Sequence, residues 1–152
     1  MIEHRHGIGF ARYKNLGAYC AVVAEIEAAR EIRVQRLVVA IDVGQVVNPD
    51  GVANQAEGGA IQAASWTLKE AVRFDRTRIT SASWEDYPIL GFSEVPAVEV
   101  EIVACPEDAP WGGAGEAAQG PTAAAIANAV RDALGVRVRD LPITPERIAA
   151  TD

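Results

Sequence analysis

Two stretches rich in β-branched residues, both in the first third of the chain, limit the possible folds more than any other feature. Residues 19–26 and 32–41 are mainly valine, isoleucine and alanine, and apolar and polar positions partly alternate along them. This pattern is typical of strands in a sheet. It predicts a meander of about three strands between Gly7 and Val43.

The segment Asn48-Pro49-Asp50 follows this meander and has the features of a helix start. It offers an N-cap side chain, a proline suited to the first helical position and an acid for the positive end of the helix dipole. We expect a helix over residues 49–69. Its interior contains Gly51, Gly58 and Gly59, each of which costs about 1 kcal/mol relative to alanine in a helix. This cost indicates that something lies close to the helix backbone.

The remaining sequence predicts two further strands and a second helix. Residues 70–79 and 97–104 have strand patterns, and one face of the second strand is expected to be wet. Residues 81–96 are rich in aromatic residues and prolines, which predicts a functional or partner-covered loop. An alanine-rich helix is expected from Pro121 to a stop at Gly135.

Together these elements predict an α+β fold, a mostly antiparallel sheet with two main helices packed on it. The 152 residues suit one domain, so residues 1–152 are expected to form a single unit. The chain is 49% hydrophobic and 23% charged, values typical of a globular protein rather than a disordered one. Alanine and glycine are abundant, which predicts close backbone packing rather than a bulky aliphatic core.

Charge and hydropathy exclude several classes of partner. The formal net charge of −7 would repel a phosphate backbone, so we expect no nucleic acid partner. No apolar stretch approaches the roughly 18 to 20 residues that cross a bilayer, and the start lacks an apolar signal core. We expect no membrane span and take the cytoplasm as the default location, with the periplasm as the alternative if the chain is exported with a partner.

Cysteines and histidines give no strong indication of a metal site. Cys20 and Cys105 lie far apart without a CxxC spacing, so this chain alone can build neither a zinc ribbon nor an iron–sulfur cluster. We expect two buried, reduced thiols. His4 and His6 near the N-terminus are weak metal-binding candidates, because chain ends are often disordered.

The strongest candidate for chemistry is Glu116, which follows Gly112, Gly113 and Gly115 and precedes the second helix. The glycines allow backbone amides to approach a bulky ligand. A carboxylate near the positive end of a helix dipole is favoured in its ionised form, which a general base requires. The alternative is that Glu116 merely caps the helix.

A second candidate surface lies on the first predicted helix. Gln55, Gly58, Gly59 and Gln62 are three or four positions apart and share one helix face. This strip carries amides and no bulky side chains, so it can meet a polar heterocycle edge-on. The alternative is tight helix–sheet packing with solvated glutamines.

These motifs together carry a family resemblance. Gly113-Ala114-Gly115-Glu116 with its alanine-rich helix, Asp42-Val43-Gly44, Asn48-Pro49 and Gln55-Ala56-Glu57-Gly58-Gly59 resemble segments of the molybdenum hydroxylases, the xanthine dehydrogenase and aldehyde oxidoreductase family. The similarity covers nearly the whole chain. Residues 115–121 and 141–147 resemble in particular the large subunits of the isoquinoline and nicotinate oxidoreductases.

The resemblance implies a set of roles. Glu116 would be the general base in the hydroxylation of an N-heteroaromatic or aldehyde carbon, with water as the oxygen source. Gln55 would form a hydrogen bond with the pterin cofactor, the strip with Gly58 and Gly59 would bind the cofactor, and Gly113-Ala114-Gly115 would lie beside the metal centre. The cofactor's dithiolene holds the metal in this family, and its cytosine dinucleotide form is one alternative here. The substrate stays unassigned.

Length is where the chain departs from the family, whose molybdenum subunit is several times longer. The resemblance places this chain at the C-terminal portion of that subunit. It implies as partners the remainder of the subunit and an iron–sulfur subunit, with no iron–sulfur or flavin site in this chain. Two alternatives stay open: a non-catalytic fragment or interaction domain without cofactor, and a carboxylate-based hydrolase using Glu116 with Glu57.

Overall fold

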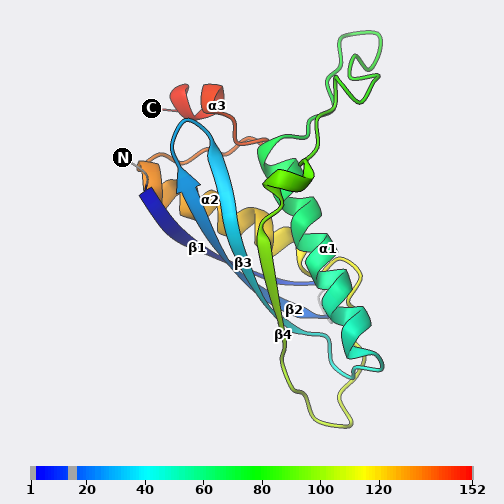
Figure 1. Cartoon of the computed structure of the whole chain (residues 1–152). Helices are drawn as coiled ribbons and strands as arrows, with labels where there is room; N and C mark the ends of the chain where they lie inside the picture. Colours follow the sequence, from blue (N-terminus) through cyan, green and yellow to red (C-terminus); the bar gives the residue numbers. More distant parts are fainter. Residues whose placement is uncertain (1–2, 14–16, 152) are drawn as a thin grey trace.

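A computed structural model describes residues 3–13 and 17–151 of the chain. It contains a four-stranded sheet, two long helices and a short C-terminal helix (Figure 1). The elements in chain order are β1 (Glu3–Arg12), β2 (Tyr19–Ala28), β3 (Ile32–Asp42), α1 (Pro49–Leu68), the short 3-10 helix η1 (Phe92–Glu94), β4 (Ala97–Ile102), α2 (Gln119–Leu134) and α3 (Pro145–Ala149).

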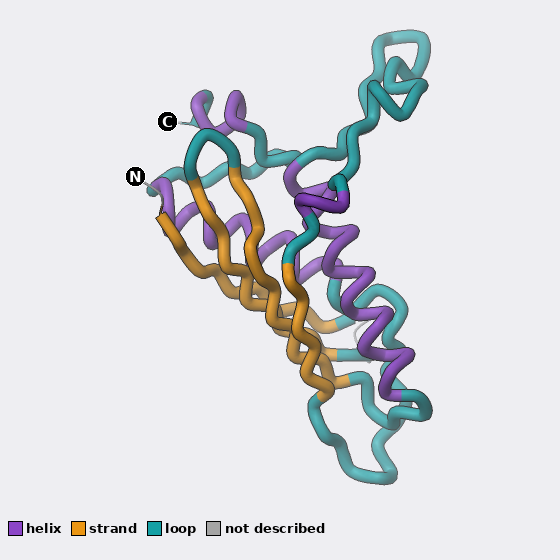
Figure 2. Tube along the Cα trace, in the orientation of Figure 1, coloured by secondary structure: helices purple, strands orange, loops and turns teal. Residues whose placement is uncertain are grey.

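The strands lie side by side in the order β1-β2-β3-β4 (Figure 2). Strands β1, β2 and β3 form the antiparallel meander that the sequence predicts, and β4 pairs with β3 in parallel. A parallel neighbour needs a crossover connection, and here that connection contains α1. The predicted α+β class, with a mostly antiparallel sheet and two main helices, is confirmed.

Both long helices pack on one face of the sheet. The core on that face consists of alternate strand residues that are fully buried, chiefly Val22, Ala24, Ile26, Leu37, Val39 and Ile41. Helix α2 approaches β1 so closely that a Cβ atom added at Gly7 would overlap the carbonyl oxygen of Ala125, and one at Gly9 would overlap that of Pro121. Small residues therefore allow backbone to pack directly on backbone, as the composition indicated.

The helix boundaries follow from local capping. The Asn48 side chain accepts a hydrogen bond of 3.0 Å from the Gly51 N–H, and Pro49 is the first residue of α1. Helix α2 ends at Gly135, whose φ of 75° is the left-handed conformation that glycine adopts without strain. The second helix starts at Gln119, two residues before the predicted Pro121.

The predicted strand over residues 70–79 is wrong. That stretch makes a single bridge between Phe74 and Ile79, because the Asp75 side chain accepts hydrogen bonds from the N–H groups of Thr77 and Arg78 and reverses the chain. Residues 71–89 instead form an arm that projects away from the sheet and helices (green in Figure 1). We call this segment the projecting arm.

The base of the projecting arm is fixed to the end of α1. The Tyr87 hydroxyl donates a hydrogen bond of 2.9 Å to Glu70, and the Leu90 N–H donates one of 3.0 Å to the Ser65 hydroxyl. The fourth strand also differs slightly from expectation, since β4 ends at Ile102 rather than at residue 104. Its exposed positions include Glu99 and Glu101, as the alternating pattern predicts.

The prediction of two buried, reduced thiols is confirmed for Cys20 and is wrong on burial for Cys105. Cys20 is buried and free, whereas Cys105 is free but partly exposed, because it follows β4 in a loop rather than lying in the core. The His4 side chain lies outside the described residues, and His6 faces Glu25 across 3.9 Å. Across residues 3–13 and 17–151, no helix is long and apolar enough to cross a membrane.

Candidate functional site

The glycine-rich segment before α2 lies at the end of the sheet where β1 and β3 finish. The Gly112 N–H donates a hydrogen bond of 2.7 Å to the carbonyl of Val43, just after β3. Gly113 has a φ of 80°, a conformation that disfavours residues with a side chain. The segment is therefore a loop whose path depends on glycine and on one anchor to the sheet.

Glu116 lies in this loop with an exposed side chain that accepts a hydrogen bond from the Tyr13 hydroxyl through Oε2. The capping alternative fails, because Ala118 is the N-cap of α2 and no side chain caps it. Glu116 contributes only its main-chain carbonyl, which accepts a hydrogen bond of 3.3 Å from the Gln119 N–H. The carboxylate is thus oriented by Tyr13 beside the start of α2.

Sequence reasoning missed Tyr13. The two residues are 103 positions apart, so no local pattern could pair them. Tyr13 follows β1 directly, and the register of β1 with β2 brings this end of β1 beside the loop. The sheet therefore supplies a donor to a carboxylate that the loop presents.

The amide-bearing face of α1 meets the same loop. The Gln55 Nε2 donates a hydrogen bond of 2.8 Å to the Gly115 carbonyl, and the Gln119 Nε2 donates one of 2.9 Å to the Gln62 Oε1. A Cβ at Gly59 would be in ordinary contact with Gln119, 3.5 Å from its Cγ. The face therefore joins α1 to the loop, and its glutamines are not simply solvated.

The two glycines of α1 that the sequence analysis assigns to cofactor binding have different surroundings. Gly59 is buried, whereas Gly58 is exposed and a Cβ there would have no heavy atom within 4 Å. Glu57 follows Gln55 by two positions, about 200° around the helix, so it cannot face the loop as Gln55 does. The structure thus brings Gln55 to the Glu116 loop and does not bring Glu57 there, which removes the basis of the two-carboxylate hydrolase.

A shallow hollow of about 580 Å³ separates the start of α1 from the loop. Its lining includes Val47, Asn48, Gln55, Trp111, Gly113 and Gly115. A Cβ at either of these two glycines would have no heavy atom within 4 Å, so both face open space. Trp111 is exposed, and its Nε1 donates a hydrogen bond to the Gln45 side chain. The hollow combines an aromatic edge, amides and bare backbone, which suits a flat polar heterocycle.

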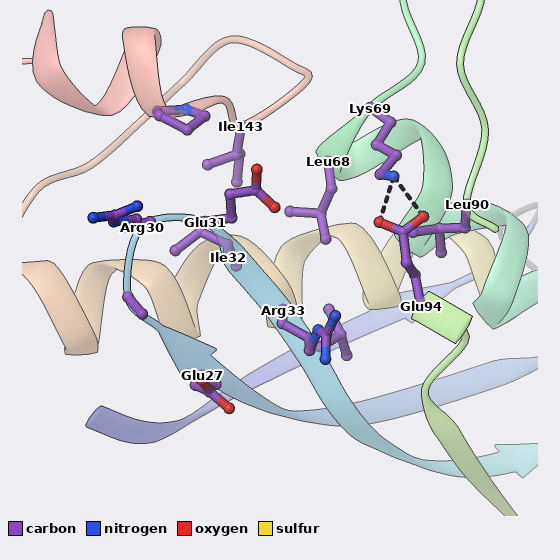
Figure 3. A pocket seen from close by; sticks show the side chains of 13 residues that line it. Glu27, Arg30, Glu31, Ile32, Arg33, Leu68, Lys69, Leu90, Glu94 and Ile143 are labelled. Carbon is purple, nitrogen blue, oxygen red and sulfur yellow. Dashed lines mark hydrogen bonds and ion pairs between the residues drawn. The ribbon is translucent and has the colours of Figure 1, made fainter. Parts of the chain in front are cut away.

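A second cavity, of about 620 Å³, lies at the opposite end of the sheet, beside the β2–β3 turn (Figure 3). Lys69 and Glu94 form an ion pair in its lining, with distances of 2.5 and 2.6 Å from Nζ to the two carboxylate oxygens. The Lys69 hydrogen bond and a second from the Gly91 N–H lower the pKa of Glu94 below its ordinary value. None of the site residues predicted from the sequence lines this cavity.

Comparison with protein families decides the identity of the fold. Residues 3–96 match the family model described as a molybdopterin cofactor-binding domain. The chain belongs to this family. The match covers Gln55, Gly58 and Gly59, whereas Gly113, Ala114, Gly115 and Glu116 lie after its last residue.

The relatives of this molybdopterin cofactor-binding domain are much longer proteins, and the chain matches only a part of each. The nicotinate dehydrogenase of Pseudomonas putida has a subunit that is 43% identical over 95% of the chain, which spans 13% of that protein. The beta subunit of isoquinoline 1-oxidoreductase from Brevundimonas diminuta is 34% identical over 91% of the chain, which spans 18% of it. The similarity to both oxidoreductases agrees with the resemblance seen in the sequence.

Solved structures of two enzymes contain the same fold as this molybdopterin cofactor-binding domain. Quinoline 2-oxidoreductase from Pseudomonas putida 86 aligns with a TM-score of 0.76 and 30% identity over 88% of the chain and 18% of that structure. Aldehyde oxidoreductase from Desulfovibrio gigas aligns with a TM-score of 0.75 and 27% identity over 88% of the chain and 15% of that structure. The domain thus corresponds to a molybdopterin-binding part of the large subunits of the xanthine dehydrogenase and aldehyde oxidoreductase family.

The described residues contain no group of three or more histidine, cysteine, aspartate or glutamate side chains that could hold a metal ion. A metal centre at this site would therefore depend on ligands from elsewhere. The hollow fits a pterin group in one respect that the structure supplies: Gly113 and Gly115 form an open cradle that a Cβ would partly fill, next to the Gln55 amide.

Proposed function

We propose that this chain forms one wall of the molybdopterin site in a molybdenum hydroxylase that acts on an N-heteroaromatic or aldehyde carbon, with Glu116 as the catalytic base. The observation that carries the proposal is the meeting of three segments at the loop before α2. Tyr13 from the end of β1 donates to the Glu116 carboxylate, and Gln55 from α1 donates to the carbonyl of Gly115, the residue before Glu116. The relatives named for nicotinate, isoquinoline and quinoline support an N-heteroaromatic substrate.

Each residue has a defined task in this proposal. Glu116 accepts a proton at a carboxylate oxygen, and the Tyr13 hydroxyl fixes the direction of that carboxylate through Oε2. The Gln55 amide uses one N–H for its hydrogen bond to Gly115. Its second N–H and its carbonyl oxygen bind the pterin. Gly113, Ala114 and Gly115 present main chain to the cofactor, and Gly58 and Gly59 keep bulky side chains off this part of α1.

The bound cofactor supplies the redox chemistry and the metal centre. The chain's own contribution is positioning, because it holds the base and the pterin-binding amide side by side through hydrogen bonds between α1 and the loop. The loop is anchored at its start by the hydrogen bond from Gly112 to Val43, and α2, which follows it, is joined to α1 by the hydrogen bond from Gln119 to Gln62.

The proposal is tested in a chimera of the related nicotinate dehydrogenase subunit from Pseudomonas putida. The segment of that protein matching this chain is replaced by the present sequence, and the chimera is produced with that enzyme's other subunits. We expect the chimera to contain molybdenum and pterin, and Glu116→Gln to lower kcat about 100-fold or more without loss of molybdenum. Cytidine monophosphate released on acid hydrolysis reports the dinucleotide form of the cofactor.

The matched control is Glu57→Gln, an exposed helix position that does not face the loop. It should leave kcat and molybdenum content unchanged. Full activity in Glu116→Gln would exclude the base assignment. A chimera with neither molybdenum nor pterin would favour the non-catalytic interaction domain instead.

A further inference from the structure

The face of the sheet opposite α1 and α2 carries large exposed apolar side chains. Ile8 is 63% exposed and Phe10 is 65% exposed on β1, and Val23 and Tyr19 on β2 are 36% and 40% exposed. The strand register aligns the side chains of this face in two central rows, Ile8–Val23–Val38–Glu99 and Phe10–Ala21–Ala40–Glu101. We call the surface formed by these two rows the open face.

Charged groups surround the apolar centre of the open face. His6, Glu25 and Arg36 form the adjoining row on one side, and Arg36 donates hydrogen bonds of 2.9 and 2.5 Å to Glu99. Glu101 makes no ion pair with another described residue. An apolar centre with a polar rim is the usual anatomy of a protein interface.

Small residues and contacting aromatic rings lie on this side of the sheet. Ala21 and Ala40 leave a shallow strip beside the larger Phe10, whose ring stacks on Tyr19 at 6.3 Å between centroids. The Arg12 guanidinium lies over the Tyr19 ring at 5.1 Å. These contacts hold the aromatic rings in place without covering them. Binding a partner would therefore cost little additional side-chain entropy.

Two observations select the occupant. The chain spans only 13% to 18% of the relatives named above, so in those proteins much additional polypeptide accompanies this fold. The open face also lies near the candidate site. Arg12 forms the next row beyond Phe10, paired with Tyr19, and it directly precedes Tyr13, the donor to Glu116. A polypeptide that covers the open face would therefore lie next to the end of β1 that carries Tyr13.

A second copy of the chain suits the open face less well. Each copy carries a formal net charge of −7, so two copies repel each other at long range. On the β4 edge of the open face, Glu99 is neutralised by Arg36 and leaves Glu101 as the acidic group, which favours a partner that presents a basic group there.

We infer that the open face is the docking surface for the polypeptide corresponding to the rest of a molybdenum hydroxylase large subunit. That polypeptide packs an apolar surface on Ile8, Phe10 and Val23 and places a cationic group near Glu101. The inference rests on the proposed function for the nature of the partner, and it adds which surface of this chain the partner uses.

The test uses the chimera described above, with Phe10→Glu and Val23→Glu as the disruptive variants. Their matched controls are Phe74→Glu and Val72→Glu on the projecting arm, where these residues are 75% and 56% exposed. In the isolated chain, all four variants should keep the circular dichroism spectrum and cooperative unfolding, because exposed positions are substituted. In the chimera, we expect Phe10→Glu and Val23→Glu to lower the yield of assembled, molybdenum-containing protein at least tenfold, and the arm variants to match the parent.

The outcomes separate this inference from the proposed function. Assembly and molybdenum content unaffected by Phe10→Glu and Val23→Glu would overturn the docking surface, whatever the result for Glu116→Gln. Sedimentation of the isolated chain as a dimer that Phe10→Glu converts to a monomer would show a second copy on the open face and would also overturn it. Full activity in Glu116→Gln with assembly lost in Phe10→Glu would leave the docking surface standing and remove the base assignment. A parent chimera that does not assemble overturns both.

Discussion

The side-chain amide of Gln55 donates a hydrogen bond of 2.8 Å to the main-chain carbonyl of Gly115, although the residues are 60 positions apart in the chain. This bond fixes the distance between α1 and the loop that carries Glu116. Its polarity is specific, because Gln55 is the donor and a carbonyl can only accept.

Replacement of Gln55 by glutamate should therefore weaken the junction between α1 and the loop. A carboxylate cannot donate, and its oxygen would face the Gly115 carbonyl oxygen, so we expect a loss of about 1 kcal/mol in the free energy of unfolding. Gln62→Glu is the matched control, because Gln62 accepts from Gln119 and a carboxylate still accepts. Urea unfolding of both variants at neutral pH measures the difference, and equal costs would contradict the assigned donor.

The glycines of β1 and α1 should respond to alanine in opposite directions. Gly9→Ala places a Cβ against the Pro121 carbonyl and should cost about 2 kcal/mol or more. Gly58→Ala meets no neighbouring atom and replaces glycine within a helix, so it should stabilise the chain by about 0.5 to 1 kcal/mol. Denaturant midpoints measure both changes.

Gly58→Ala also separates stability from cofactor binding. If the cofactor approaches α1 at Gly58, the chimera carrying this variant should hold less molybdenum even though the isolated chain is more stable. Undiminished molybdenum would remove Gly58 from the proposed binding surface.

The Lys69–Glu94 ion pair should make stability depend on pH in the acid range. Lys69 lowers the pKa of Glu94 in the folded chain below its ordinary value of 4.5, so the folded state binds this proton less readily than the unfolded state. The stabilisation is fully present above the ordinary value and is lost as the pH falls through the lowered one. Wild type and Lys69→Met should differ near neutral pH and converge in acid, whereas Lys69→Arg should follow the wild type; a constant difference across the acid range would contradict this.

The two cysteines should differ in reactivity. Burial raises the pKa of the Cys20 thiol to about 11, so it carries almost no thiolate near pH 8 and is shielded from reagents. Cys105 is partly exposed. Native chain should release close to one equivalent of thionitrobenzoate from Ellman's reagent and two in denaturant, and Cys105→Ser should abolish the native reaction. Two equivalents from the native chain would show that Cys20 is accessible.

Sequence patterns predicted the elements whose determinants are local. The Asn48 cap and the Gly135 stop act within a few residues of themselves, so both helices were placed within two residues of their ends. The stretch from 70 to 79 misled because it contains Val72, Phe74 and Ile79, residue types that are common in strands. Asp75 turns the chain instead, and among the described residues this stretch pairs only through the Phe74–Ile79 bridge.

The candidate site was predicted in its residue types but not in its contacts. Glycines before an acid indicated a ligand-binding loop at Glu116, and the spacing of Gln55 and Gln62 indicated one helix face. The partners of these residues are Tyr13, Gly115 and Gln119, which reach them only through the register of the sheet and the packing of α1 beside α2. Long-range geometry of this kind leaves no signature in a single sequence.

The parallel pairing of β3 with β4 has a consequence for the order of folding. Strands β1, β2 and β3 meet through short connections, whereas β4 reaches β3 only after α1 and the projecting arm have been laid down. Closing a longer loop costs more entropy, so we expect the three-strand meander to form first and β4 to add at its edge last. Pulse-labelling hydrogen exchange should therefore show the amides of β4 protected after those of β2, the strand at the centre of the meander.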